Sequence, residues 1–150
     1  HLMKSLTKHI IATTAGTDTL ALRAGAGVIF AAHGAQKLFG WFGGYGLEGT
    51  AGWMASIGLE PSLVMAALAG SAEFFGGLLL IIGLIVRPAA LVLAVTMLVA
   101  AITVHLDNGL FMSNNGYEFA LALLVISISL SIRGAGSFSI DRLLQQSLAH

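Results

Sequence analysis

The 150-residue sequence contains no cysteine. That absence excludes disulfide exchange, thiolate nucleophiles and iron–sulfur ligation through cysteine. Charged residues make up only 9% of the chain, against about a quarter in soluble domains, and the seven basic residues balance the seven acidic ones. A neutral chain offers no basic surface, so nucleic acid is not an expected partner. The first residues also lack the short apolar core of a cleaved signal peptide.

Hydrophobic residues, in contrast, make up 57% of the sequence, and its mean hydropathy is +0.90. Crossing a bilayer as a helix takes roughly 20 apolar residues. Four segments approach that length: 20–39, 62–86, 88–106 and 117–133. These segments are too long to be strands of a transmembrane barrel, and they lack the alternation of apolar and polar residues that such strands show. We therefore expect a single-domain, all-α integral membrane protein, with the lipid bilayer as its first partner.

Small residues recur along the second segment at helix-contact spacing. The stripe comprises Ala66, Ala69, Gly70, Glu73, Gly76 and Gly77. Such a stripe lets a neighbouring helix approach closely. It predicts a compact up-down bundle of four transmembrane helices. Pro88 suits the first turn of the third helix, since its missing N–H would be unpaired there.

The segments that join the predicted helices differ in length. Only Arg87 separates the second span from the third, which predicts a tight turn. The segment 40–60 is longer and rich in glycine, and Leu47, Ala51 and Met54 would share one face of a short helix. We expect this segment to lie at the membrane surface after the first span and to cap the bundle.

Basic residues predict the orientation. Those that would share one side are Lys4, Lys8, Arg23, Arg87, Arg133 and Arg142, with Lys37 alone on the other side. By the positive-inside rule both termini are cytoplasmic, and in a bacterium the protein lies in the inner membrane. The predicted organisation is a cytoplasmic segment 1–19, a membrane domain 20–144 and a tail 145–150. His1 and Leu2 are interpreted as a cloning remnant.

Polar side chains from all four spans are predicted to meet in the outer half of the bundle. They are His33, Gln36 and Lys37 in the first span, Glu73 in the second, His105 in the third and Glu118 in the fourth. Charge inside hydrocarbon costs about 2.5–3.5 kcal/mol per residue on insertion scales, so such groups are candidates for a functional site. Glu73 is predicted to pair with Lys37 or His33.

Each of these residues also has a purely structural interpretation. Glu73 and Lys37 could form an ion pair that serves packing alone. Lys37 could reach the headgroups, and His105 and Glu118 lie close to the interface. His33 and His105 could ligate a haem, but no motif supports this. Helices with small residues on their contact faces would also pack too closely to leave room for it. The convergence of the groups favours a functional site, and no metal site is indicated.

Two sequence runs, "HGAQKLFGWFGG" at 33–44 and "AEFFGG" at 72–77, are specific enough to suggest a family. With "VHLDNGLF" at 104–111 and "SIDRLL" at 139–144, they make the chain resemble the DoxX family over about 20–144. The resemblance implies a four-helix protein of the bacterial inner membrane. It also implies a loose link to membrane redox chemistry, such as thiosulfate:quinone oxidoreductase, quinone and oxidant detoxification, or complexes with superoxide dismutase and sulfurtransferase.

Two functions are open on the sequence. The first is a subunit or accessory of a quinone-linked oxidoreductase, with Glu73, His33 and Lys37 as its catalytic groups. The quinone would be bound by Gln36, Trp41, Phe42, His105 and Glu118. Without a flavin, metal or cysteine motif, the electrons would come from a redox partner protein. The second function is a non-enzymatic membrane scaffold, an assembly partner or a small-solute carrier, and a carrier of this size would form a homodimer.

Overall fold

The computed structural model describes the whole chain, residues 1–150, and contains helices without strands. The α-helices are α1 (Leu2–Ile11), α2 (Asp18–Phe39), α3 (Gly46–Ser56), α4 (Ser62–Ile82), α5 (Val86–Ala100), α6 (Glu118–Arg133) and α7 (Ile140–Leu148). A π-helical turn over Ala101–His105 continues α5, and 3₁₀ turns lie at Trp41–Gly43, Leu106–Asn108 and Met112–Asn114. The prediction of an all-α protein is confirmed.

Helices α2 and α4 approach each other closely because glycine faces glycine. A Cβ atom on Gly77 would lie 2.6 Å from the carbonyl oxygen of Gly27, and one on Gly70 would lie 2.7 Å from a leucine side chain of α2. A larger residue at Gly77 would force the helices apart. Gly76 lies on another side of α4 and faces Leu93 of α5. The predicted stripe of small residues is therefore a contact surface, divided between two neighbouring helices.

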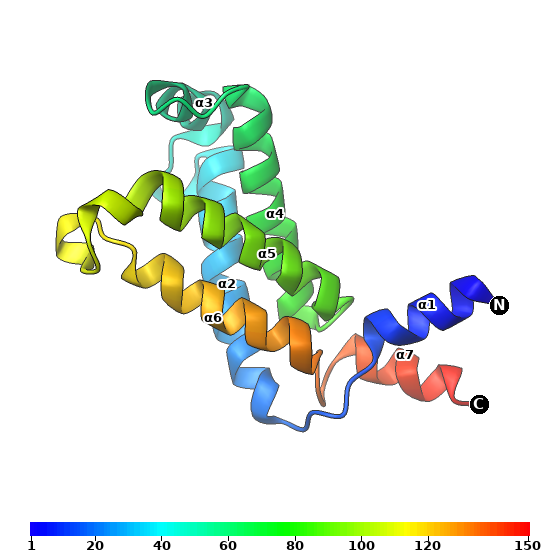
Figure 1. Ribbon diagram of the computed structural model, residues 1–150. Helices are drawn as coiled ribbons and strands as arrows, with labels where there is room; N and C mark the ends of the chain where they lie inside the picture. Colours follow the sequence, from blue (N-terminus) through cyan, green and yellow to red (C-terminus); the bar gives the residue numbers. More distant parts are fainter.

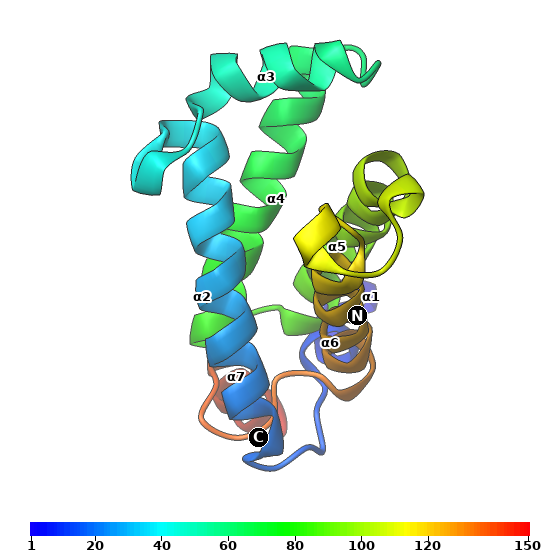
Figure 2. The ribbon, with the colours of Figure 1, turned by 90° about the vertical axis from the view of Figure 1, so that its left-hand side faces the viewer.

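Helices α5 and α6 form the second closely packed pair. Large buried side chains join the two pairs, among them Phe30 of α2, Leu80 of α4, Leu93 of α5 and Leu130 of α6. This core lies toward the end of the bundle where α4 turns into α5. Figures 1 and 2 show that α5 then leaves α4 at an angle. The two pairs are thus joined at one end and diverge toward the other.

Buried polar groups close the joined end of the bundle. Arg23 is fully buried, and its guanidinium donates hydrogen bonds to carbonyl oxygens of α4 and of the segment before α7. The Asp141 carboxylate accepts hydrogen bonds from the backbone N–H groups of Ile85 and Val86, at 2.8 and 3.0 Å. Asp141 of α7 therefore caps the N-terminus of α5. Burial raises the pKa of the Asp141 carboxyl, although both hydrogen bonds and the charge of Arg23 oppose the shift.

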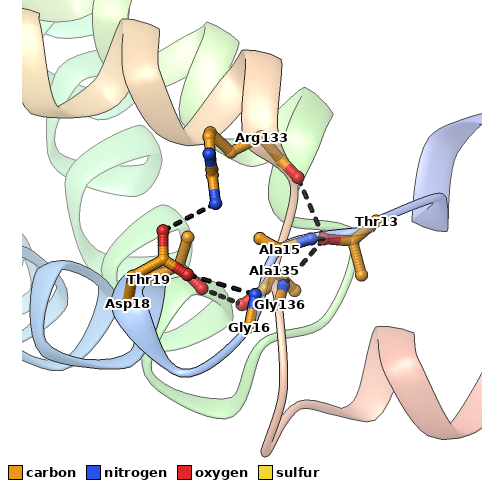
Figure 3. A network of polar contacts seen from close by, with 8 residues as sticks. All are labelled: Thr13, Ala15, Gly16, Asp18, Thr19, Arg133, Ala135 and Gly136. Carbon is orange, nitrogen blue, oxygen red and sulfur yellow. Dashed lines mark hydrogen bonds and ion pairs between the residues drawn. The ribbon is translucent and has the colours of Figure 1, made fainter.

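A second polar network ties the segment before α2 to the segment after α6 (Figure 3). The Thr13 hydroxyl donates to the carbonyl oxygen of Arg133 and accepts from the N–H of Gly136. The Thr19 hydroxyl donates to another carbonyl oxygen of this loop, and Arg133 forms an ion pair with Asp18 at 2.6 Å. The beginning and the end of the chain are thereby held together at this end of the bundle.

The predicted spans agree with α2, α4, α5 and α6 to within a few residues, with one correction at the turn between α4 and α5. Helix α4 ends at Ile82, because Gly83 adopts a left-handed backbone with φ of +73°. Arg87 therefore lies in the first turn of α5, together with Pro88, and not in the turn itself. The predicted tightness of this turn and the predicted place of Pro88 are confirmed.

By length and composition, two helical stretches could cross a membrane: Ser62–Ile82, and Val86–Asn108, which is α5 with its continuation. Helix α2 is 22 residues long but includes Asp18, Arg23 and Lys37, and α6 has only 16 residues. Length and composition therefore do not by themselves indicate a span for α2 or α6.

The short helix expected within 40–60 is present as α3, which lies across the ends of α2 and α4 (Figures 1 and 2). Its Ala51 and Met54 pack against Ala66 of α4. No helix is predicted within 1–19, yet α1 occupies most of the first eleven residues, and α7 runs across the predicted boundary at 144. Both helices are short and rich in polar residues, so hydropathy alone does not indicate them.

Candidate functional site

An ion pair lies between α2 and α4, in the half of the bundle nearer α3. Lys37 Nζ lies 2.8 Å from Glu73 Oε2. The Glu73 side chain is 5% exposed and that of Lys37 is 26% exposed, so the carboxylate is buried more deeply than the ammonium. Glu73 Oε2 accepts no hydrogen bond of ordinary geometry, so the attraction is mainly Coulombic. The predicted pairing of Glu73 with Lys37 is confirmed.

The local sequence explains how a lysine reaches a carboxylate inside an apolar bundle. Lys37 lies in the last turn of α2, and Glu73 lies near the middle of α4. Gly70, one turn before Glu73, leaves space for the lysine stem, since a Cβ atom there would lie 3.2 Å from Lys37 Cβ. The apolar stem therefore packs over glycine while the ammonium group turns toward Glu73.

The ion pair also lines a small cavity of about 120 Å³ among α2, α4, α5 and α6. His33 and His105 line the same cavity, so four of the predicted site residues meet there. The His33 ring lies against Phe119 of α6, with ring centroids 5.8 Å apart. His105 Nδ1 lies 2.9 Å from the carbonyl oxygen of Asn115, in the loop before α6. This contact holds the His105 imidazole between the loop and the cavity.

A larger groove of about 850 Å³ adjoins the small cavity, between α4 and α5. The ion pair and His105 line both spaces. The walls of the groove are mainly apolar, with Leu68 on α4, Val95 on α5, and Trp53 and Met54 contributed by α3. Figure 2 shows that α5 diverges from α4, and residues of both helices line the groove. An apolar groove thus reaches a charged pair and an imidazole.

Four predicted binding residues lie outside both spaces: Gln36, Trp41, Phe42 and Glu118. Gly40 adopts a left-handed backbone with φ of +72° and turns the chain away after α2, which leaves Trp41 and Phe42 exposed. Gln36 Nε2 donates to the carbonyl oxygen of Phe42 at 3.2 Å and so stabilises this turn. Glu118 lies in the first turn of α6, where its negative charge interacts favourably with the positive end of the helix dipole.

Several residues that line the two spaces carry no signal in the sequence. They include Thr96 and Met97 on α5, Thr103 on the π-helical turn that continues it, and Met112 and Phe119 around α6. In a long apolar helix, another apolar or hydroxyl residue fits the helical period at any position, so spacing does not single it out. The structural feature that marks this region is the π-helical turn at Ala101–His105, a geometry frequent at functional sites.

The arrangement brings a cation, a carboxylate and two imidazoles to one end of an apolar groove. An ammonium or imidazole group can donate a hydrogen bond to a carbonyl oxygen, and a carboxylate or imidazole can accept and release a proton. Three or more His, Asp or Glu side chains do not come together in the geometry of a metal centre. The site suits a largely apolar ligand that carries polar oxygen atoms.

Fold and site together define a small, all-helical, membrane-associated protein with a polar centre between its helices. The DoxX family model matches residues 19–106, and the chain belongs to that family. The resemblance based on "HGAQKLFGWFGG" and "AEFFGG" is thereby confirmed.

Three relatives have curated descriptions. A protein of Bacillus subtilis (strain 168), described as "Putative oxidoreductase CatD", is 39% identical over 123 residues, which cover 82% of this chain and 84% of that protein. Two uncharacterized proteins of Haemophilus influenzae are 33% and 36% identical over 88 and 80 residues. These alignments cover 59% and 51% of this chain, and 58% and 60% of the Haemophilus proteins. No solved structure matches the chain.

Proposed function

We propose that this protein spans the inner membrane four times and serves a quinone-linked oxidoreductase or a quinone and oxidant detoxification system, as a subunit or accessory. In this proposal the groove between α4 and α5 binds a lipid-soluble quinone. The observation that carries the proposal is the apolar groove of about 850 Å³ that reaches the Lys37–Glu73 pair. The family and the relative described as an oxidoreductase support a role in membrane redox chemistry.

Four spans are proposed because α2 and α6 pack along the two most apolar helices. Helix α2 packs on α4, and α6 packs on α5, so each pair would share one depth in the membrane. The two buried basic residues of α2 have partners that allow them to lie within the membrane. Arg23 is buried with its guanidinium bonded to carbonyl oxygens, and Lys37 is paired with Glu73.

Charge asymmetry supports cytoplasmic termini. Six of the seven basic residues lie at the end of the bundle that carries α1, α7 and the turn between α4 and α5. Five of the seven acidic residues lie toward the other end: Glu48, Glu60, Glu73, Asp107 and Glu118. By the positive-inside rule the basic end faces the cytoplasm. The groove, α3 and the ion pair would then occupy the outer half of the bundle.

The groove fits a quinone in size and in chemistry. Its volume lies within the range of about 300–1,000 Å³ that is usual for small-molecule sites. Lys37, which lines it, can donate a hydrogen bond to a quinone carbonyl oxygen. His105 also lines it, but its Nδ1 faces the carbonyl oxygen of Asn115, so its Nε2 can donate only when the ring carries both protons and otherwise accepts from a quinol hydroxyl. Along α5 the lining extends from Leu91 to Val104, about 20 Å of helix, which can hold an isoprenoid tail. The small cavity of about 120 Å³ between the histidines is too small for a haem, so this cofactor is not proposed.

Reduction of a quinone to a quinol consumes two electrons and two protons. The chain has no cysteine and no flavin motif, so a partner protein or bound donor would supply the electrons. Protons can pass through His33 and Glu73, which line the cavity next to the groove. His105, in contact with the carbonyl oxygen of Asn115, is the proposed link from this cavity to water at the outer surface.

The two tryptophans of the chain allow a direct test. Trp53 lines the groove, whereas Trp41 lies outside it. The Trp41→Phe variant leaves Trp53 as the only tryptophan reporter, and Trp53→Phe leaves Trp41 as the matched control. A short-tailed ubiquinone analogue, titrated into protein in detergent, should quench Trp53 fluorescence to saturation and Trp41 fluorescence only in proportion to its concentration. Lipid extraction of the purified protein should yield a quinone.

Two further measurements examine the groove itself. The Val95→Phe variant fills part of the groove without touching the ion pair, and it should weaken saturable quenching of Trp53. An analogue without a tail should bind more weakly than the tailed one. Absence of saturable quenching, together with a lipid extract free of quinone, would overturn the proposal and favour a scaffold or a small-solute carrier.

A further inference from the structure

Helices α1 and α7 lie outside the bundle and pack against each other. Figure 1 shows them side by side, leaving the bundle at the end where α4 turns into α5. Figure 2 looks nearly along them, so they run across the direction of α2 and α4. Ile11 of α1 is buried, and the contacts of Asp141 fix the start of α7. The pair therefore has a defined place at this end of the bundle.

Each of the two helices has an apolar face that is largely exposed. On α1 the apolar residues recur at helical spacing: Met3 and Leu6, which are exposed, and Ile10, which is half-buried. On α7 and directly before it, the exposed apolar residues are Phe138, Ile140, Leu143 and Leu144. Met3 is 80% exposed and Leu143 is 66% exposed. Together these seven residues form the α1–α7 surface.

The side of α1 opposite its apolar face is basic, and no acidic side chain at this end of the bundle is free to neutralise it. Lys4 and Lys8 lie one turn apart on the side of α1 away from its apolar face, and both are exposed. Arg142 lies on α7. Of the acidic residues at this end, Asp18 is held in an ion pair and Asp141 is buried as the cap of α5. The polar side of the α1–α7 pair is therefore positively charged.

We propose that the α1–α7 surface docks on the bilayer itself and selects anionic lipid headgroups. An apolar face with lysines on the opposite, polar face, on helices that run across the spans, is the pattern of amphipathic helices that lie in a membrane interface. The apolar side chains enter the acyl boundary, while Lys4 and Lys8 attract headgroup phosphates. A soluble acidic protein is the rival partner. The bilayer is favoured because the surface lies level with the ends of α4 and α5, where headgroups are already present.

This inference rests on the proposed membrane insertion and not on quinone binding. Its test uses the absence of cysteine, since Leu6→Cys and Leu143→Cys each give a single labelling site. Each variant, labelled with bimane, is placed in nanodiscs of phosphatidylcholine with or without phosphatidylglycerol, and brominated acyl chains serve as the quencher. Both labels should be quenched more strongly in the anionic discs. Ser5→Cys is the matched control, since this exposed residue lies about 100° around α1 from Leu6 and should be quenched less.

Charge variants separate electrostatic from apolar docking. Each basic residue near an anionic surface adds about a fivefold preference, so Lys4→Glu with Lys8→Glu should lower docking at least about 30-fold and remove the difference between the discs. Lys4→Arg with Lys8→Arg should preserve it. Both lysines are exposed, so the unfolding midpoint should not change.

Three results would overturn the inference. Equal quenching of labels at Leu6 and Ser5 would show that no apolar face enters the bilayer. Equal quenching in neutral and anionic discs would show that anionic headgroups are not selected. Labels that stay unquenched in both discs and become shielded only with an added soluble protein would assign the surface to a protein partner. Each of these results is independent of the quinone titration.

Discussion

Removing the charges of the Lys37–Glu73 pair one at a time should have unequal effects on stability. Lys37→Met leaves a carboxylate whose side chain is 5% exposed without its cation. Breaking a buried pair in this way costs about 3–5 kcal/mol in comparable cases. Glu73→Gln leaves an ammonium group whose side chain is 26% exposed, near the end of α2, and this group can turn to the headgroups. We expect this second change to cost about 1–2 kcal/mol.

The double variant, Lys37→Met with Glu73→Gln, should be about as stable as Glu73→Gln alone, because no uncompensated charge is left. The coupling free energy between the two positions then equals the cost of Lys37→Met alone, about 3–5 kcal/mol. That value lies below the gross attraction of about 6 kcal/mol for unit charges 2.8 Å apart at an effective dielectric constant of 20. The difference is consistent with the desolvation that a buried pair requires.

The assay is a double-mutant cycle on reversible unfolding in detergent, with quinone quenching of Trp53 measured on the same four proteins. If the pair is only structural, the double variant regains both stability and quinone binding. If the pair belongs to the binding site, stability returns while binding stays lost, and His33→Phe lowers binding with little unfolding. A coupling free energy below about 0.5 kcal/mol would show that the two residues do not act as partners and would refute the reasoning.

Three further predictions concern the rest of the molecule. Gly77→Leu should lower the unfolding midpoint and the yield by forcing α2 from α4, and normal values for both would contradict close packing. Because burial raises the pKa of Asp141, its contribution to stability is largest at low pH and is lost as pH rises through that raised pKa. Asp141→Asn should therefore flatten the acid side of the thermal stability profile, and an unchanged profile would exclude Asp141 as the titrating group. An impermeant maleimide added from the periplasm should label Ser113→Cys and spare Ser147→Cys, and the reverse pattern would invert the topology.

The parts of the structure that could be predicted are those governed by hydropathy and by residue size. The length of the apolar segments located α4 and α5, and the spacing of small residues identified the side of α4 that contacts α2. The pairing of Glu73 with Lys37 followed from the cost of an isolated charge in hydrocarbon. Each of these predictions uses either the pattern of residues within one or two helical turns or the general free-energy cost of burying a charge without a partner.

The parts that could not be predicted depend on backbone geometry and on distant contacts. The left-handed turn at Gly40 moves Trp41 and Phe42 away from the groove, although their composition suits a ring-binding wall. The angle between α4 and α5, which opens the groove, results from packing over the whole core. Helix α7 owes its place to Asp141, whose partners lie 55 and 56 residues earlier in the chain.

This distance along the chain has a consequence for synthesis. Arg23 is synthesised early, but two of its three carbonyl partners belong to residues 137 and 138. The backbone N–H groups at the start of helix α5 likewise remain uncapped until Asp141 has been synthesised. This end of the bundle therefore cannot close until nearly the whole polypeptide has been synthesised. Until then the Arg23 guanidinium needs water as a substitute partner, so a chain that still lacks α7 has an open, hydrated end.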